Sequence, residues 1–213
     1  TVDGIGGLTT GDIAGMSTTQ LSGLTTTQLK GFSTTDIAVL NTTQVGSLLT
    51  TQVAALSTTQ LNALTATQIS FFSTVQIGVL TTTQVKGLST TFAASLTTTH
   101  VSSLTTTQLK ALTTTDLNAM SVAQISFLTT VQVANLTSTQ IGALSTTNLA
   151  AMTTQQVGAL TTTQIKALDS TDIAALSTTQ LGTWTSTQFS ALTVDAIGGL
   201  TTSDVASMST TQL

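Results

Sequence analysis

The stretch LSTTQLNALTATQI, residues 56–69, contains one eight-residue pattern twice: a large apolar residue, Ser or Thr, two short residues, Gln and a second large apolar residue. The pattern continues in steps of eight from Thr1 to Leu213. Because self-similarity at a fixed short period is the signature of a repeat architecture, the sequence predicts a single continuous array over residues 1–213, with about 26 octapeptide repeats and no separate domains. Both ends fall inside a repeat, so we expect the chain to be part of a longer array.

Each position of the octad has a constant chemical character when Leu8 is placed in slot eight. Slot eight is always large and apolar, and slot five is apolar from Ile5 to Leu213. Slot four is Gln or Asp nearly everywhere, and slots six and seven hold mostly small residues. Slot one is Ser or Thr except at Asn41, Leu49 and Asp169. Since Ser, Thr, Asn and Asp are the residues preferred at helix N-caps, slot one is predicted to be an N-cap.

The order of the slots is typical of a helix start. In a capping box, Ser or Thr accepts a hydrogen bond from the amide three residues later, and the Gln side chain at that position accepts one from the cap amide. Slot eight of one octad and slot five of the next also stand where a hydrophobic staple forms across the cap. Asp in slot four suits the positive end of a helix. The octad therefore predicts one very short capped helix per repeat.

A single long helix does not fit the period. Eight residues of a continuous α-helix turn about 80° beyond two full turns, so the apolar stripe would wind around the helix within a few octads. A helix that restarts in every octad keeps slots five and eight on one side. Because such short helices are unstable alone, they must stack on their neighbours and bury these two slots.

A β-solenoid is the alternative fold. Thr, Val and Ile favour strands, and two or three octads per coil could place rows of Thr on the outside. Slots five and eight would then point to opposite faces of a strand, and solenoid corners usually need Gly or Asn at fixed places. Here Gly exchanges freely with Ala, Ser and Lys. We therefore predict an all-α repeat, a solenoid or superhelix of short capped helices.

Composition limits the partners of the chain. Only 6% of the residues are charged, the net charge is −4 and Arg is absent, so no nucleic-acid binding is expected, since phosphate contacts need a basic face. No apolar run approaches the roughly 18 residues of a membrane span. The absence of Cys fits a secreted protein as well as a cytosolic one.

The titratable residues do not predict a catalytic or metal site. A general base needs a partner that orients it, and the spacing supplies none for His100, which takes slot four. We interpret His100 as a polar substitute in an outward or capping slot. Five slot-four aspartates are too far apart in sequence to form a calcium loop: Asp12, Asp36, Asp116, Asp172 and Asp204. We expect no enzyme activity, no cofactor and no metal.

Aromatic and basic side chains also keep to defined slots. Trp184 in slot eight is expected in the core. Phe92 in slot four beside Ala93 in slot five suggests an anchor that has moved by one residue, and hence a local defect or bend. Phe71 and Phe127 in slot seven are predicted to thicken the apolar face and are the best candidates for contact with another chain. Slot six, which we interpret as exposed, holds all four lysines: Lys30, Lys86, Lys110 and Lys166.

Two stretches carry a resemblance to a known kind of protein. LTTTQVKGLSTT, residues 80–91, and LTTTQIKALDSTDIAALSTTQL, residues 160–181, resemble the Thr/Gln-rich octapeptide repeats of giant repetitive bacterial proteins, which are secreted or surface-exposed and adhesin-like. The resemblance covers the whole chain. It implies a structural role outside the cell or at its surface, and it carries over no catalytic residues.

These observations favour a structural function. Repeat arrays normally need polar terminal repeats for solubility, whereas residues 1–4 and 210–213 belong to ordinary octads. We therefore expect self-association end to end, as a homopolymer, into an extracellular filament, sheath or stalk. The alternative function is a surface module that binds ice or a cell-surface polysaccharide through a regular Thr array, which fits best if the fold is β.

Overall fold

The computed structural model describes residue 5 and residues 7–212. All regular elements in this part of the chain are helices of a few residues, and it contains no strand. The predicted all-α repeat is therefore confirmed, and the β-solenoid is excluded for the described residues. The chain divides into two compact units, residues 1–112 and residues 113–213. The octad pattern runs through this boundary without a break, and a single continuous array stays a prediction.

The helices follow one another at intervals of one octad. The first unit contains α2 (Thr10–Ala14), α3 (Thr18–Ser22), α4 (Thr26–Lys30), α5 (Thr34–Ala38), α6 (Thr42–Ser47), α7 (Thr50–Ala55), α8 (Thr58–Asn62), α9 (Ala66–Ser70), α10 (Thr74–Gly78), α11 (Thr82–Lys86), α12 (Thr90–Ser95), α13 (Thr98–Ser103) and α14 (Thr106–Ala111). The second contains α15 (Thr114–Ala119), α16 (Val122–Ser126), α17 (Thr130–Asn135), α18 (Ser138–Gly142), α19 (Thr146–Ala150), α20 (Thr154–Gly158), α21 (Thr162–Ile165), α22 (Ser170–Ala175), α23 (Thr178–Leu181), α24 (Ser186–Phe189), α25 (Val194–Ile197) and α26 (Thr202–Ser207).

Each helix begins at slot two because the slot-one residue caps it. In α8 the Ser57 hydroxyl accepts a hydrogen bond from the Gln60 amide at 3.1 Å, and Gln60 Oε1 accepts one from the Ser57 amide at 2.9 Å. Some helices end directly at an extended residue, as α7 does at Leu56 with φ −61° and ψ 140°, and others are followed by one more residue in the helical region, as α8 is by Ala63 with φ −82° and ψ −13°. The predicted capping box is confirmed for the helices α2 to α26, apart from those whose octads contain Leu49, Phe92, Asn148 and Ala196.

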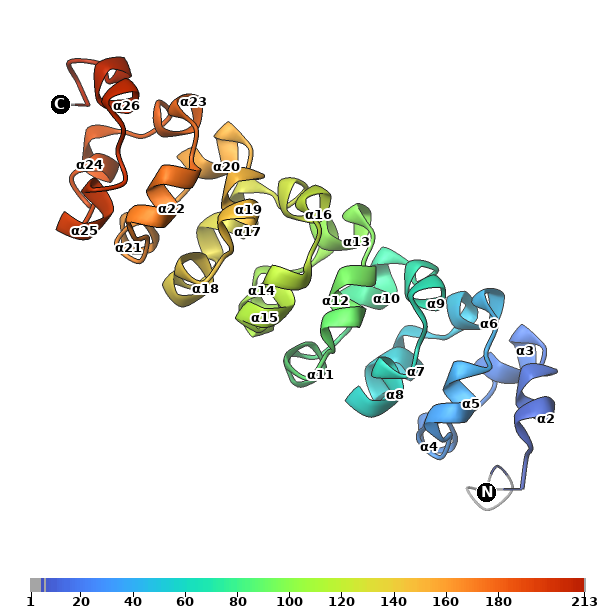
Figure 1. Ribbon diagram of the computed structural model, residues 1–213. Coiled ribbons are helices and arrows are strands. Elements are labelled where there is room, and N and C mark those ends of the chain that lie inside the picture. The colour runs from blue at the N-terminus through green and yellow to red at the C-terminus, as the bar shows by residue number, and fades with distance from the viewer. Residues whose placement is uncertain (1–4, 6, 213) are drawn as a thin grey trace. The chain divides into compact units, whose positions relative to one another are not determined.

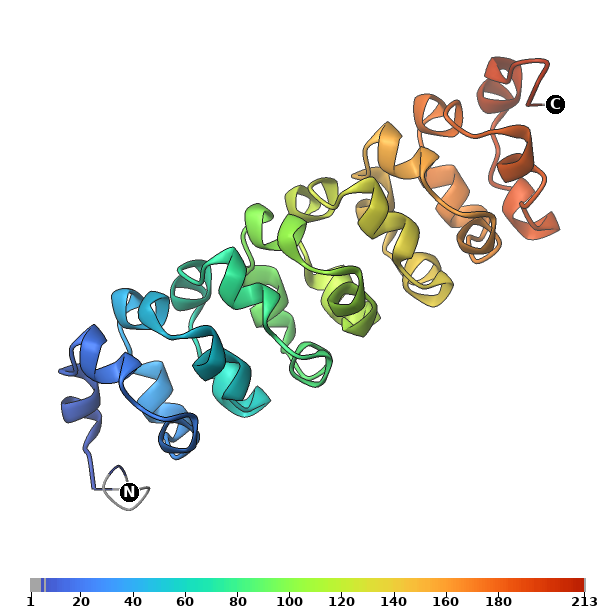
Figure 2. The same cartoon turned by 180° about the vertical axis from the view of Figure 1, so that it is seen from behind.

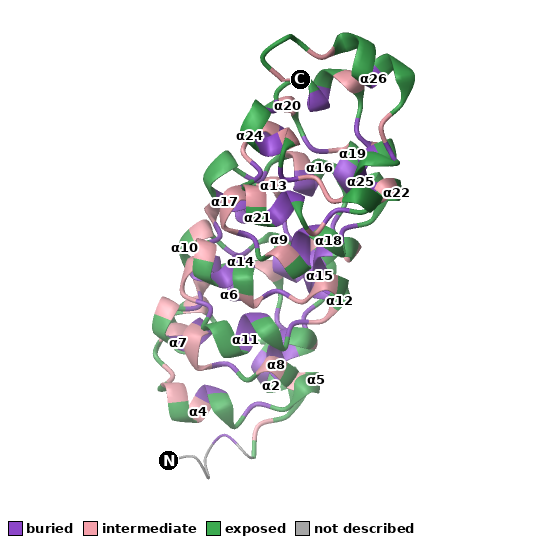
Figure 3. Ribbon diagram, turned by 90° about the vertical axis from the view of Figure 1, so that its left-hand side faces the viewer, coloured by how far each residue is buried: buried purple, intermediate pink, exposed green. Residues whose placement is uncertain are grey.

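Slots five and eight form the core of each unit. Slot-five side chains are buried from Ile13 to Leu181, and slot-eight side chains are buried from Phe32 to Trp184. Figure 3 shows these buried positions on the inner side of the helices, with exposed residues on the outer turns. Burying one large aliphatic side chain contributes about 1.5–3 kcal/mol, so stacking rather than helix propensity holds the short helices in place.

The helices of each unit wind into coils of three and a half octads. Side-chain hydrogen bonds between successive coils join residues that are 28 apart, as from Gln76 to Leu48. Helices three apart in the chain pack against each other, for example α3 with α6 and α20 with α23. In Figures 1 and 2, α4, α8 and α11 follow one another along one edge of the first unit, so the step between neighbours is four octads and then three. Two coils therefore span seven octads.

Candidate functional site

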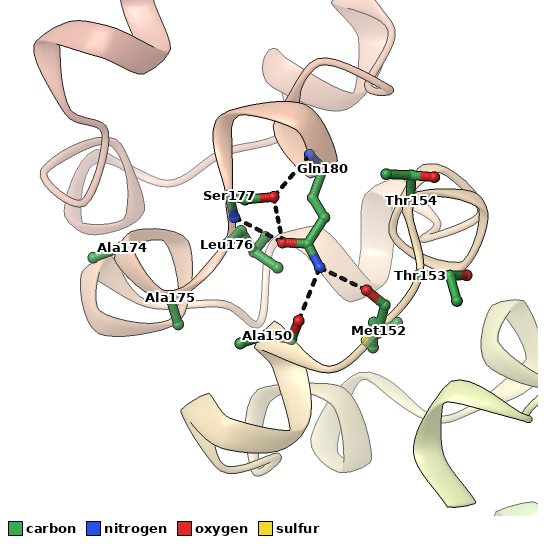
Figure 4. Close-up of a pocket in the computed structure, with 9 residues that line it drawn as sticks. All are labelled: Ala150, Met152, Thr153, Thr154, Ala174, Ala175, Leu176, Ser177 and Gln180. Atoms are coloured by element: carbon green, nitrogen blue, oxygen red, sulfur yellow. Dashed lines mark hydrogen bonds between the residues drawn. The ribbon is translucent and has the colours of Figure 1, made fainter. Parts of the chain in front are cut away.

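The slot-four glutamines link successive coils. Oε1 of Gln180 accepts a hydrogen bond from the Ser177 amide at 2.7 Å, and Nε2 donates to the carbonyls of Met152 at 2.6 Å and Ala150 at 3.2 Å (Figure 4). One side chain thus closes the cap of its own helix and ties that helix to the preceding coil. The same bond to the slot-eight carbonyl 28 residues earlier is made by Gln44, Gln52, Gln60, Gln68, Gln76, Gln84, Gln108, Gln156, Gln164, Gln188 and Gln212.

These links reach carbonyls at the end of a short helix. At the end of α7 the Leu56 carbonyl has no backbone donor among the described residues, whereas the Val53 carbonyl also accepts from the Leu56 amide at 3.2 Å. The last carbonyls of a helix have no amide donor within it, and a buried carbonyl without a hydrogen bond is costly. Gln84, which is buried, donates to the carbonyls of Val53 at 3.0 Å and Leu56 at 2.7 Å, at the end of α7. The sequence predicted the capping half of this arrangement but not the link between coils.

His100 takes over both tasks of a slot-four glutamine. Its Nδ1 accepts from the Thr97 amide at 3.3 Å, and its Nε2 lies 2.7 Å from the Phe72 carbonyl. Since a carbonyl oxygen only accepts, Nε2 carries the hydrogen and the ring is neutral. Burial lowers the pKa of His100 below its usual value, although the bond to Phe72 acts in the opposite direction. The predicted capping role is confirmed, but the side chain is buried rather than directed outward.

Slot-four aspartates close the cap but cannot donate to a carbonyl. Asp204 accepts from the amide and the hydroxyl of Thr201 at 2.9 and 2.6 Å, and from the hydroxyl of Thr178 in the preceding coil at 2.7 Å. Burial raises the pKa of Asp204, but these hydrogen bonds outweigh it, so the pKa lies below the usual value. Burial raises the pKa of Asp172, which pairs with the predicted cap Asp169. Within the described residues no cluster of acidic and histidine side chains suits a metal ion.

Phe92 is buried in slot four, as expected if the large apolar side chain moves there from slot five. The helix α12 is nevertheless intact. The local defect is a missing hydrogen bond, because Phe92 offers no acceptor to the cap amide of Ser89. Asn62, in slot six of the preceding coil, replaces it. Its Oδ1 accepts from the Ser89 amide at 2.8 Å, and its Nδ2 donates to the Gly87 carbonyl at 2.8 Å.

The second unit contains the same replacement. Asn148 in slot four donates to the Leu117 carbonyl at 3.2 Å but does not accept from the cap amide of Ser145. Asn118 Oδ1 accepts from that amide at 2.7 Å, and Asn118 Nδ2 donates to the Ala143 carbonyl at 2.6 Å. Asn62 and Asn118 are the two asparagines in slot six, and each stands 30 residues before the slot-four residue that it assists. Sequence analysis missed this pairing, although its spacing was visible.

The outer surface of each unit carries isolated apolar side chains. Phe71 and Phe127 are 55% and 56% exposed, so the prediction that they thicken the buried face is wrong. Slot seven closes the helix and points to solvent in both octads. Val75 and Val131, four residues after each phenylalanine, are exposed as well. Contact of Phe71 and Phe127 with another chain stays a prediction. The lysines are exposed as predicted, and Trp184 is buried, with Nε1 donating to the Val157 carbonyl at 2.9 Å.

The first coil of the first unit presents donors on its outer side. Gln20 accepts from the Ser17 amide at 2.8 Å, and Gln28 accepts from the Thr25 amide at 2.9 Å. Their Nε2 atoms have no acceptor among the described residues, because no coil precedes them there. Gln20 is exposed and Gln28 is half-buried, whereas Gln44 is buried under the first coil.

The last coil of the second unit presents apolar side chains and backbone carbonyls. In slot five, Ile197 and Val205 are exposed, and they line an open hollow together with Leu192, Leu200 and Met208. In the described part of the chain no slot-four glutamine side chain donates a hydrogen bond to the carbonyls of Val205 and Met208. Within each unit a coil therefore donates side-chain amide hydrogens to the preceding coil and offers carbonyls to the following one.

Comparison with known families and proteins places these features in context. Within the described residues no helix combines the length and apolar character that crossing a membrane requires. Comparison with curated proteins finds no match. The family model of the ALTTAQ repeat matches residues 5–42, 28–58, 114–146, 138–170 and 165–202, which together cover more than half of the chain in both units. The Thr/Gln-rich repeat inferred from the octads is thereby confirmed, and the chain belongs to the ALTTAQ repeat family.

Proposed function

We propose that the chain is a structural protein whose coils stack from one copy to the next into an extracellular filament, sheath or stalk. The observation that carries this proposal is that each coil is complementary to its neighbours. It donates side-chain amide hydrogens to the preceding coil, as Gln180 does to Met152 and Ala150, and it offers carbonyls to the following coil, as Leu48 does to Gln76.

Stacking between copies would use contacts of a kind that the chain makes repeatedly. It would cover exposed apolar side chains and give buried carbonyls an amide donor, and both effects favour association. A contact between two different faces of the same molecule does not close on itself, so it continues into a fibre unless a rotation closes it into a ring. No catalytic group is needed for such a role, and we propose that the protein is not an enzyme.

The proposed location outside the cell rests on the resemblance to secreted, adhesin-like repeat proteins. The alternative function, binding of ice or a polysaccharide, needed flat rows of Thr on a β-sheet. In the structure the Thr residues of slots two and three lie on the first turns of separate helices, as at Thr58 and Thr59. That alternative therefore loses its main support.

The test is the association state of the purified chain. We expect the sedimentation coefficient to rise with protein concentration, and electron microscopy to show fibres whose averaged power spectrum lacks the cross-β reflection at about 4.7–4.8 Å. A monodisperse monomer at high concentration would contradict the proposal. Retention on a polysaccharide column by such a monomer would favour the binding module instead.

A further inference from the structure

We infer that copies of this chain also join side by side, with a basic edge of the first unit of one copy against an acidic edge of the second unit of another. The contact runs along the outside of the coils, so it adds to the proposed end-to-end stacking and does not depend on it. Each edge lies within one unit. Because the two edges carry opposite charges, the partner that fits is a second copy of the chain.

The basic edge of the first unit follows α4, α8, α11 and α14. Figures 1 and 2 show α4, α8 and α11 one after another along that edge, and α14 packs against α11. These helices contain no carboxylate, and they carry the exposed lysines of the first unit: Lys30, Lys86 and Lys110. Lys30 and Lys86 are seven octads apart, which is two complete coils, so they face the same side. With no carboxylate on these helices to balance the lysines, the edge has a positive potential.

Lys86 stands at an open hollow that suits an acidic side chain. The hollow spans α8, α11 and α14 and is lined by Thr58, Thr82, Thr83, Lys86, Gly87 and Ala111. Gly87 leaves room for it, because a built Cβ there would lie 2.7 Å from Thr58 Cγ2. Threonine hydroxyls and a lysine ammonium group can donate hydrogen bonds, and a carboxylate accepts them. The hollow therefore offers the donors that a carboxylate of another chain needs.

The acidic edge of the second unit follows α15, α18, α21, α22 and α25. Figures 1 and 2 show α18, α21 and α25 one after another along that edge, and α18 packs against α15 and α21, as α22 does against α25. The octads of these helices contain four aspartates and one lysine: Asp116, Lys166, Asp169, Asp172 and Asp195. Asp116 and Asp172 are buried in their caps, whereas Asp169 and Asp195 are exposed. The edge is therefore negative, and its two exposed carboxylates are open to another chain.

The exposed charges on the two edges have matching spacings. Lys86 and Lys110 stand three octads apart at α11 and α14, which pack against each other. Asp169 and Asp195 stand three octads apart at α22 and α25, which also pack against each other. Asp195 reaches the start of α22, where its Oδ2 accepts from the Ser170 amide at 3.3 Å. Two lysines can therefore meet two carboxylates in one contact, which contributes modestly to affinity and determines which surfaces meet.

Carbodiimide cross-linking at low salt tests the contact, because it joins a lysine to a carboxylate only where the two side chains meet. Unlabelled chain is mixed with chain labelled with heavy nitrogen, so that a cross-link between two copies contains both isotopes. We expect mixed-isotope cross-links from the lysines of the basic edge to Asp169 and Asp195. Few should reach Asp12, which is also exposed but lies on α2. Mixed cross-links that reach Asp12 as often as Asp169 would overturn the proposal.

Two variants that each lose one edge test the pairing by complementation. The lysine variant loses the basic edge through Lys30→Ala, Lys86→Ala and Lys110→Ala. Ala already occupies slot six at Ala38, so these helices should form as before. The aspartate variant loses the exposed carboxylates of the acidic edge through Asp169→Asn and Asp195→Asn. Asn serves as a cap at Asn41, whose Oδ1 accepts from the Gln44 amide at 2.9 Å.

Binding of dissolved chain to immobilised chain compares the possible combinations. The lysine variant should bind the aspartate variant like parent binds parent, and each variant should bind itself about tenfold more weakly. High salt should remove this difference. A control with Asp12→Asn and Asp36→Asn, which neutralises two carboxylates outside the edges, should bind like the parent. Equal binding in all combinations would overturn the side-by-side contact, whereas fibres formed by both variants would leave end-to-end stacking intact. Such equal binding with lysine-dependent retention on an anionic polysaccharide would assign the basic edge to a polyanion instead.

Discussion

Two neighbouring octads, residues 81–88 and 89–96, build the same helix with different side chains. In the first, Gln84 accepts from the Thr81 amide at 2.8 Å and donates to Leu56 in the preceding coil at 2.7 Å. In the second, Phe92 fills the same buried position with a ring, and Asn62 from the preceding coil accepts from the cap amide of Ser89 at 2.8 Å.

The comparison separates two requirements that glutamine meets with one side chain. Every cap amide needs an acceptor, and successive coils need a bond between them. In the octad of Gln84 the bond runs from the later coil to the earlier one. In the octad of Phe92 it runs from the earlier coil to the later one, since Asn62 reaches forward to Ser89 and Gly87. In the octad of Phe92 a slot-six asparagine therefore meets the two requirements that the missing glutamine leaves open.

The largest effect is expected when a buried slot-four glutamine is truncated. Gln84→Ala leaves the Thr81 amide and the buried Leu56 carbonyl without their partner and removes one of two donors to the Val53 carbonyl, which should lower the free energy of unfolding by about 1–3 kcal/mol or more. The matched control is Gln28→Ala in the first coil, where only the cap bond is lost, at about 0.5–1 kcal/mol. Urea unfolding measures both. Equal losses would show that the link between coils contributes nothing.

A smaller effect is expected at Asn62. Asn62→Ala removes the partners of the Ser89 amide and the Gly87 carbonyl, and because the site is exposed, water replaces them in part, so the loss should be about 0.5–1.5 kcal/mol. Ala occupies slot six at Ala38 and Ala54, so the change does not harm the helix. In a Phe92→Gln background the new glutamine can accept from the Ser89 amide. Asn62→Ala should then lower the free energy of unfolding by less than it does in the parent chain. A double-mutant cycle without coupling would refute the replacement.

The effect at His100 depends on pH. The pKa of His100 is lowered in the folded chain by burial, from a usual value of 6.5. The unfolded chain therefore binds a proton first, so the contribution to stability is complete above about pH 6.5 and is lost as the pH falls below it toward the folded pKa. His100→Gln keeps a cap acceptor and a donor without titrating. Below pH 6.5 we expect the free energy of unfolding of the parent chain to fall relative to that of His100→Gln. Above about pH 7.5 the difference between the two should be constant, and urea unfolding curves measure both. A constant difference throughout would contradict a buried neutral His100.

The smallest effect is expected on the outer surface. Phe71→Ser and Phe127→Ser change exposed side chains that close intact helices, so each should alter the free energy of unfolding by less than about 0.5 kcal/mol. Thermal unfolding of the two variants would show this directly. A loss comparable to that of Gln84→Ala would mean that these rings pack in a core after all.

The sequence sufficed for the local structure but not for the coil. Caps, staples and the buried slots follow from interactions within about five residues, which the octad displays directly. The number of octads per coil depends on contacts 28 residues apart, such as Gln76 with Leu48, and an eight-residue period contains no mark of that distance. The one visible sign was the spacing of 30 residues from Asn62 to Phe92 and from Asn118 to Asn148. Phe71 and Phe127 were misplaced because an aromatic residue beside the core slots was assumed to join the core.

The coil of three and a half octads is the central claim, and an intramolecular disulfide tests it most directly. The double variant Thr178→Cys, Asp204→Cys replaces two side chains on successive coils whose oxygen atoms are 2.7 Å apart. Thr178→Cys with Gln212→Cys keeps the slots but moves the second cysteine one octad further. Counting free thiols after mild oxidation should show nearly complete bond formation in the first variant and little in the second. Equal bond formation in both, or a preference for the second, would contradict the coil.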